Sequence, residues 1–174
     1  MARPIDFAPP FGSIDALGSP TDPPEERIGV GVAIVGAGPG GLACAIRLGQ
    51  LLEEHPDVRE RLGDVPIAVL EKGKQPGSHL LSGAVVNPSP LRELFRGRLK
   101  TADLPTHGEV PGEAVYVLTR RSSYRIPPPP TMRNHGNVIL SVSELGRFLA
   151  EQAEAAGAVV LPETSATSTR SSRS

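Results

Sequence analysis

The segment 32–42 reads Val-Ala-Ile-Val-Gly-Ala-Gly-Pro-Gly-Gly-Leu, an apolar run that enters a Gly-x-Gly-x-x-Gly turn. The β-branched residues before the turn favour a strand, and the residues at 42–52 favour a helix. This strand–turn–helix pattern is typical of folds that bind dinucleotides, because the turn brings backbone and a helix N-terminus close to a pyrophosphate. The sequence therefore predicts an α/β fold with a phosphate-binding first turn.

Each residue of the turn has an expected role. Gly36 permits the tight exit from the strand, Gly38 allows close approach of a pyrophosphate, and Gly41 lets the helix pack closely on the strand. Pro39 falls at the start of the helix, where its missing N–H costs nothing. Gly40 completes the glycine-rich turn. All five are expected to contact the cofactor.

A second apolar run, 67–70, ends in Glu71. An acidic residue at this point can accept hydrogen bonds from the ribose hydroxyls of an adenosine. Glu71 stands about 30 residues after Gly41 rather than the usual ~20, because the connection 53–66 is long. We predict a βαβ nucleotide-binding unit. The alternative is a structural glycine turn with a solvated Glu71.

The composition excludes several classes of function. A net charge of −1, from 18 basic and 19 acidic residues, argues against nucleic-acid binding by a broad basic surface. No apolar run approaches the ~20 residues that a membrane-spanning helix needs. Cys44 is the single cysteine, so the chain itself can form no internal disulfide and no cysteine-ligated metal or iron–sulfur site. We expect Cys44 to be buried against the sheet.

The two ends of the chain differ from its middle. Residues 1–27 are rich in Pro, contain acids and lack an apolar signal core, so they are expected to form a disordered leader. Residues 28–162 are expected to form one nucleotide-binding domain. Residues 163–174 are mostly Ser, Thr and Arg, and are expected to be a disordered tail produced by truncation or a frameshift.

The residues after Glu71 predict further elements with irregular Pro- and Gly-rich insertions. We expect a loop at 72–88, a short helix at 90–95, and extended segments at 114–119 and 124–126. Polyproline geometry without helix is expected at 127–130, followed by a polar turn at 134–137 and a strand at 138–140. The last elements are a helix at 143–156, capped by Ser143 and Gly157, and a third strand at 158–161. In the strand order 3-2-1-4 of such sheets, the first strand would then have an unpaired edge. This predicts marginal stability and weak or absent binding of a dinucleotide cofactor.

Four motifs occur in one order: the glycine turn, Glu-Lys-x-x-x-x-Gly-x-His-x-Leu-Ser-Gly-Ala at 71–84, Asn-His-Gly-Asn at 134–137, and Glu-Gln-Ala-Glu at 151–154. Together they resemble the amino-terminal part of the electron transfer flavoprotein–ubiquinone oxidoreductases, over about residues 30–162. Reductases of the FixC and geranylgeranyl reductase type share the FAD half of this pattern but fit the segment 79–84 less well.

The resemblance implies an incomplete Rossmann-like FAD-binding domain of an enzyme that passes electrons from reduced electron transfer flavoprotein to ubiquinone. No catalytic side chain is expected, because the flavin carries the chemistry. The implied cofactor-binding positions are the glycine turn, then Glu71 and Lys72 at the ADP half, then His79, Ser82, Gly83 and Ala84 beside the flavin. For His79 an ordinary loop role remains open. His135 has either a positioning or a plain structural role.

Members of this family also carry a [4Fe–4S] cluster and sit on one leaflet of a membrane. The cluster cysteines have no counterpart here. The segment 124–130 falls where the family places a membrane-proximal loop, and a solvated Pro-rich loop is the alternative. The expected location is the cytoplasm, or the cytoplasmic side of a bacterial inner membrane. Two other functions remain open: an FAD-dependent reductase or monooxygenase, and an inactive dinucleotide-binding fragment.

Overall fold

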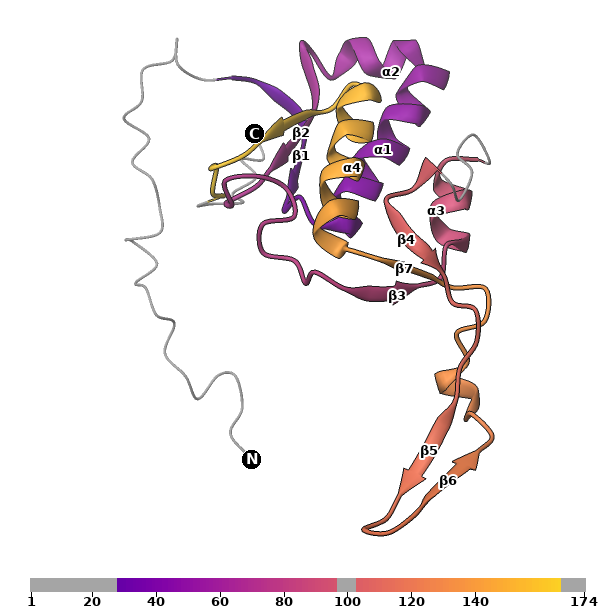
Figure 1. Cartoon of the computed structure of the whole chain (residues 1–174). Helices are drawn as coiled ribbons and strands as arrows, with labels where there is room; N and C mark the ends of the chain where they lie inside the picture. The colour runs from indigo at the N-terminus through magenta and orange to yellow at the C-terminus, as the bar shows by residue number, and fades with distance from the viewer. Residues whose placement is uncertain (1–27, 97–102, 167–174) are drawn as a thin grey trace, which may run out of the picture.

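The computed structural model describes residues 28–96 and 103–166, so the predicted leader and most of the predicted tail lie outside the described residues. The elements follow in chain order (Figure 1): β1 (Val30–Val35), α1 (Pro39–Glu54), α2 (Pro56–Arg61), β2 (Val65–Leu70), β3 (Ala84–Val86), α3 (Ser89–Leu94), β4 (Thr106–Glu109), β5 (Val115–Leu118), β6 (Ser123–Ile126), the 3₁₀ helix η4 (Pro130–Met132), β7 (Val138–Leu140), α4 (Val142–Ala155) and β8 (Val159–Leu161).

The main sheet is parallel and has the order β1-β2-β8. Its central strand β2 is the most buried, as expected for a parallel strand with neighbours on both sides. The α/β class and the order of the three predicted strands are therefore confirmed. Among the described residues, no strand pairs with the outer edge of β1, as the sequence predicted.

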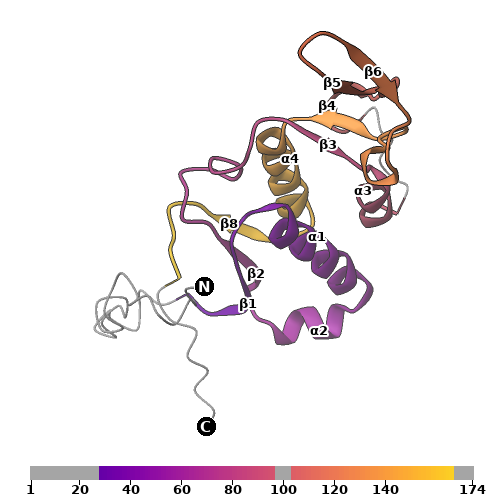
Figure 2. The same ribbon diagram turned by 90° about the horizontal axis from the view of Figure 1, so that it is seen from below.

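Helices α1 and α4 lie side by side and pack on the sheet (Figure 2). Their shared core consists of buried side chains of α1, β2 and α4: Leu42, Ala45, Ile46, Leu52, Ile67, Val69, Leu145, Leu149 and Ala153. At their crossing, a Cβ on Gly49 would lie 2.3 Å from the carbonyl oxygen of Ala156. The absence of a side chain at Gly49 thus lets the C-terminal end of α4 approach α1.

The predicted burial of Cys44 is wrong, because its side chain is exposed. Leu42, Ala45 and Ile46 define the buried stripe of α1. At 100° per residue, position 44 lies on the opposite side of the helix. Its thiol therefore faces away from the sheet.

The caps of α4 differ from the prediction. Ser141, not Ser143, precedes the helix, and its Oγ accepts a hydrogen bond from the backbone N–H of Glu144 at 3.3 Å. The helix ends at Ala155 with Ala156 as its C-cap, and Gly157 follows with a φ of +86°. A glycine in this left-handed conformation just past the end is a common helix stop.

Two smaller sheets extend beyond the parallel sheet. One has the order β3-β7-β4, and the other is the hairpin β5-β6, which projects away from the rest (Figure 1). Pro129 has a φ of −55° and a ψ of 152°, close to polyproline geometry, but η4 begins at Pro130, which corrects the prediction of no helix there. A proline fits this first position because its missing N–H is not needed. None of the described helices has the length and hydropathy to cross a membrane.

Candidate nucleotide-binding site

The glycine turn joins the end of β1 to the start of α1. Gly36 has a φ of +100°, and its N–H donates to the carbonyl of Leu70 at 2.8 Å, which extends the β1–β2 ladder. Gly38 precedes α1 and has no side chain to cap it. The first N–H groups of a helix lack partners within it, so they are available to an anion at this point.

The free space around each glycine shows which parts of the turn are open. A Cβ on Gly36, Gly38 or Gly40 would meet no atom within 4 Å. A Cβ on Gly41 would lie 2.1 Å from the carbonyl oxygen of Gly36, so only glycine fits there. The turn is thus closed on its inner side, where helix meets strand, and free of side chains on its outer side.

The carboxylate of Glu71 is tied to the glycine turn. Its Oε2 accepts a hydrogen bond from the N–H of Ala37 at 2.9 Å, and its Oε1 accepts one from the N–H of Gly73 at 2.7 Å. The Glu71 N–H in turn donates to Leu161 in β8 at 2.9 Å. Each carboxylate oxygen can accept a second hydrogen bond. The group therefore keeps acceptor capacity for the hydroxyls of a ribose.

A small pocket of about 310 Å³ lies against this carboxylate. Its walls come from the ends of β1 and β2 and from the chain after β8: Val35, Gly36, Leu70, Glu71, Lys72, Thr164, Ser165 and Ala166. Apolar walls with one acidic group suit an adenosine, whose base is flat and whose ribose carries hydroxyls. Lys72 lines the pocket with an exposed side chain, where it can meet a phosphate.

The far wall of this pocket includes residues that were predicted to belong to a disordered tail. The N–H of Thr164 donates to the carbonyl of Glu71 at 2.8 Å, and the N–H of Glu163 donates to that of Gly73 at 3.0 Å. Glu163 and Thr164 are thus held against the end of β2 rather than disordered. The Ser- and Thr-rich composition gave no signal of this, because the contacts are made by backbone atoms.

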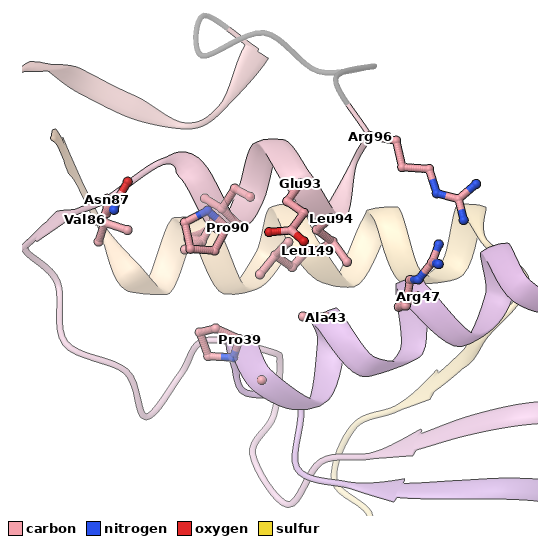
Figure 3. Close-up of a pocket in the computed structure, with 13 residues that line it drawn as sticks. Pro39, Ala43, Arg47, Val86, Asn87, Pro90, Glu93, Leu94, Arg96 and Leu149 are labelled. Atoms are coloured by element: carbon pink, nitrogen blue, oxygen red, sulfur yellow. The ribbon is translucent and has the colours of Figure 1, made fainter. Parts of the chain in front are cut away.

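A larger cavity of about 780 Å³ begins at Pro39 and Gly40 and runs along α1 (Figure 3). Its apolar lining includes Leu145 and Leu149 of α4, and Arg47 and Arg96 lie at the end away from Pro39 (Figure 3). None of the predicted residues 71–84 lines it. The sequence reasoning did not identify this cavity, because its walls come from three separate helices.

An exposed ion pair borders this cavity. Arg96 donates to Oε1 of Glu54 at 2.6 Å. This hydrogen bond, and then the guanidinium charge, lowers the pKa of Glu54 below its usual value. Arg96 is thereby held at the rim.

The predicted flavin-side residues divide into two groups. His79 lies beside the Glu71 carboxylate, since a Cβ on Gly73 would be 3.0 Å from both His79 Nδ1 and Glu71 Oε1. Ser82 and Gly83 are exposed, and Ala84 begins β3. His79 therefore belongs to the Glu71 end of the loop, whereas residues 82–84 lie further along it.

The other predicted candidates are not part of a cluster. His135 is exposed in the turn that precedes β7, where the N–H of Asn137 donates to the carbonyl of Asn134 at 2.9 Å. Within the described residues, no group of three or more His, Cys, Asp or Glu side chains could hold a metal ion.

Solved structures similar to the chain include a mutant of 2-methyl-3-hydroxypyridine-5-carboxylic acid oxygenase, with a TM-score of 0.48 and 19% identity over 75% of this chain and 30% of that one. CtdE in complex with FAD and substrate 4 has a TM-score of 0.46 and 18% identity, over 77% of this chain and 30% of that one. No protein-family model matches the chain.

Curated proteins found by sequence are more similar to this chain than these structures are. An electron transfer flavoprotein–ubiquinone oxidoreductase of Dictyostelium discoideum is 43% identical over 83% of this chain and 23% of its own length. That of Pseudomonas aeruginosa is 42% identical over 75% and 23%, and the human protein is 40% identical over 75% and 20%. The chain thus spans about a quarter or less of the relatives it matches. Over most of its length, it is a sequence relative of the electron transfer flavoprotein–ubiquinone oxidoreductases.

Proposed function

We propose that this chain is the nucleotide-binding part of an FAD-dependent oxidoreductase that passes electrons from electron transfer flavoprotein to ubiquinone. The observation that carries the proposal is the 2.9 Å hydrogen bond between the Ala37 N–H and the Glu71 carboxylate. It joins the two groups that such a site needs, one for phosphates and one for ribose. The names of the sequence relatives supply the donor and the acceptor.

The residues present fit an ADP group. Glu71 would hold the ribose, the small pocket at residues 164–166 would take the adenine, and the N-terminus of α1 would hold the pyrophosphate. The open positions at Gly36, Gly38 and Gly40 leave room for this approach. Residues 82–84 would border the flavin. FAD supplies the electron-transfer chemistry when bound, and the chain binds and orients it.

The binding unit comprises residues 28–162 together with the pocket wall at 164–166. This chain cannot by itself hold a [4Fe–4S] cluster with four cysteine ligands, because it has one cysteine. Such a cluster would be held by residues outside the quarter of the relatives' length that aligns with this chain. The proposed location is the cytoplasm or the cytoplasmic surface of a bacterial inner membrane.

The β5–β6 hairpin is the proposed membrane-facing part. Tyr116, Leu118 and Tyr124 are exposed on it, and basic side chains lie in and beside its turn at Arg120 and Arg121. Aromatic and apolar side chains favour the membrane interface, and arginines favour anionic head groups. Sedimentation with anionic vesicles should decrease in a Leu118→Ser/Tyr124→Ser variant. Equal sedimentation of wild type and variant would remove the hairpin from the proposal.

The main proposal is tested by ADP binding to the 174-residue chain, measured by calorimetry. Glu71→Gln removes a charged acceptor, and hydrogen bonds to charged groups contribute about 1.5–3 kcal/mol, so ADP affinity should fall about tenfold or more. Glu109→Gln makes the same chemical change at an exposed side chain of β4, away from the pocket, and should leave affinity unchanged. No binding by the wild type, or equal affinity in both variants, would contradict the proposal.

A further inference from the structure

We infer that Ser143, near the start of α4, is a positioning residue that holds the loop 77–84 in place for the flavin half of the cofactor. This role rests on the proposed function. The Ser143 hydroxyl is 2.8 Å from the carbonyl oxygen of Gly77 and 3.1 Å from that of Leu80. A hydroxyl has one hydrogen to donate, so the two carbonyls share it. One side chain therefore fixes both ends of a tight turn in this loop.

Small residues bring the loop directly onto the helix. A Cβ on Gly77 would lie 2.5 Å from the carbonyl oxygen of Ser143, and Gly77 also has a φ of +87°. A Cβ on Gly146 would lie 3.1 Å from both Gly77 Cα and Leu80 Cδ1. We call Ser143, Gly77 and Gly146 the loop clasp. Its geometry leaves no room for a side chain at Gly77.

A second anchor lies on the other side of the exposed part of the loop. Ala84 pairs with Leu140 in the β3–β7 ladder, and Leu140 is buried immediately before the N-cap of α4. The span 81–83 is therefore held on both sides by the same corner of the structure, where β7 leads into α4. A short span between two fixed points has little conformational freedom to lose when a ligand binds.

The span itself is presented to solvent. Leu81 is 80% exposed, Ser82 and Gly83 are exposed, and a Cβ on Gly83 would meet no atom within 4 Å. The loop clasp is also separate from the hydrogen bonds that Ala37 and Gly73 make to Glu71. His79 lies in the clasped turn beside Glu71, but the hydrogen bonds that hold the carboxylate come from Ala37 and Gly73. Loosening the clasp should therefore affect the flavin half of FAD and spare the ADP half.

The test compares FAD and ADP as probes of the same chain. In Ser143→Ala, the dissociation constant for FAD should rise about three- to tenfold, as expected for loss of one hydrogen bond, while that for ADP should not change. Amide hydrogen exchange in the ligand-free protein should become faster at residues 78–83 and stay the same at 36–41. Ser143→Thr keeps the hydroxyl and should restore FAD affinity.

Ser141→Ala is the matched control, because it removes a serine hydroxyl two residues away that caps α4 and does not hold the loop. It should lower the unfolding midpoint and leave the ratio of FAD to ADP affinity unchanged. The inference is overturned if Ser143→Ala weakens both ligands equally, if exchange at 78–83 does not change, or if the wild type binds FAD no tighter than ADP. Wild type that binds neither ligand overturns the proposed function, and the role of Ser143 with it.

Discussion

The glycine turn and the loop 77–84 belong to the same proposed site, yet they are built differently. In the turn, Gly41 packs on Gly36 five positions earlier, and the spacing is part of a recognisable motif. In the loop, the fixed geometry comes from Ser143, which is 66 and 63 positions away from its two partners. The geometry of a local motif is set by residues close together in the sequence. The geometry of the loop is set only when elements distant in the sequence pack together.

Gly41→Ala should have the largest effect, because the new methyl group would overlap a backbone carbonyl that cannot move freely. Overpacking of this kind costs about 3 kcal/mol of unfolding free energy. Urea denaturation followed by circular dichroism measures it. Gly40→Ala is the matched control. Gly40 also lies in α1, but its new Cβ would meet no atom within 4 Å, so stability should change by about 0.5 kcal/mol or less. Similar midpoints for the two variants would contradict the packing role of Gly41.

Gly77→Ala should have an intermediate effect and tests the other side of the comparison. The positive φ and the close approach of the Ser143 carbonyl together should cost about 1–3 kcal/mol, measured by the same denaturation. Gly83→Ala, in the exposed span, should be close to neutral for stability. If both variants were equally stable, the loop would not be clasped on α4 in the way described above.

The smallest effect concerns the ion pair at the rim of the larger cavity. Because Arg96 lowers the pKa of Glu54, the pair favours folding above the unfolded-state pKa of Glu54, and this contribution is lost as the pH falls through the lowered folded-state pKa. In Arg96→Gln, the pKa of Glu54 should return toward its usual value. An NMR titration of the Glu54 carboxyl carbon measures this, and an unchanged pKa in the variant would show that Arg96 is not its cause. Solvent screening keeps the effect on stability small.

Sequence reasoning found the features that depend on neighbouring residues. The strands on either side of α1, the turn between them and the acid at the end of β2 all follow from short patterns of apolar residues and glycines. The order β1-β2-β8 also followed, because parallel α/β units connect in a regular way. These parts require no knowledge of distant contacts.

The errors arose where distant contacts decide the outcome. Ser143 is a suitable cap by residue type, but its hydroxyl bonds to the carbonyls of Gly77 and Leu80, and Ser141 caps the helix instead. Thr164 lies in a polar segment, but backbone hydrogen bonding to the end of β2 places it in the pocket wall. Cys44 is a different case: it lies on the side of α1 opposite the buried stripe, so the helical period alone decides its exposure. In each case residue type alone was compatible with two environments.

The double attachment of Glu71 has a consequence for the speed of ligand association. Because Ala37 and Gly73 already hold its two oxygens, the carboxylate is aligned with the turn before any nucleotide arrives. An incoming ADP group would then find its acceptors in place, and its on-rate would not be limited by a slow rearrangement of the protein. Differences in affinity among nucleotides should therefore be expressed as differences in how long each one stays bound.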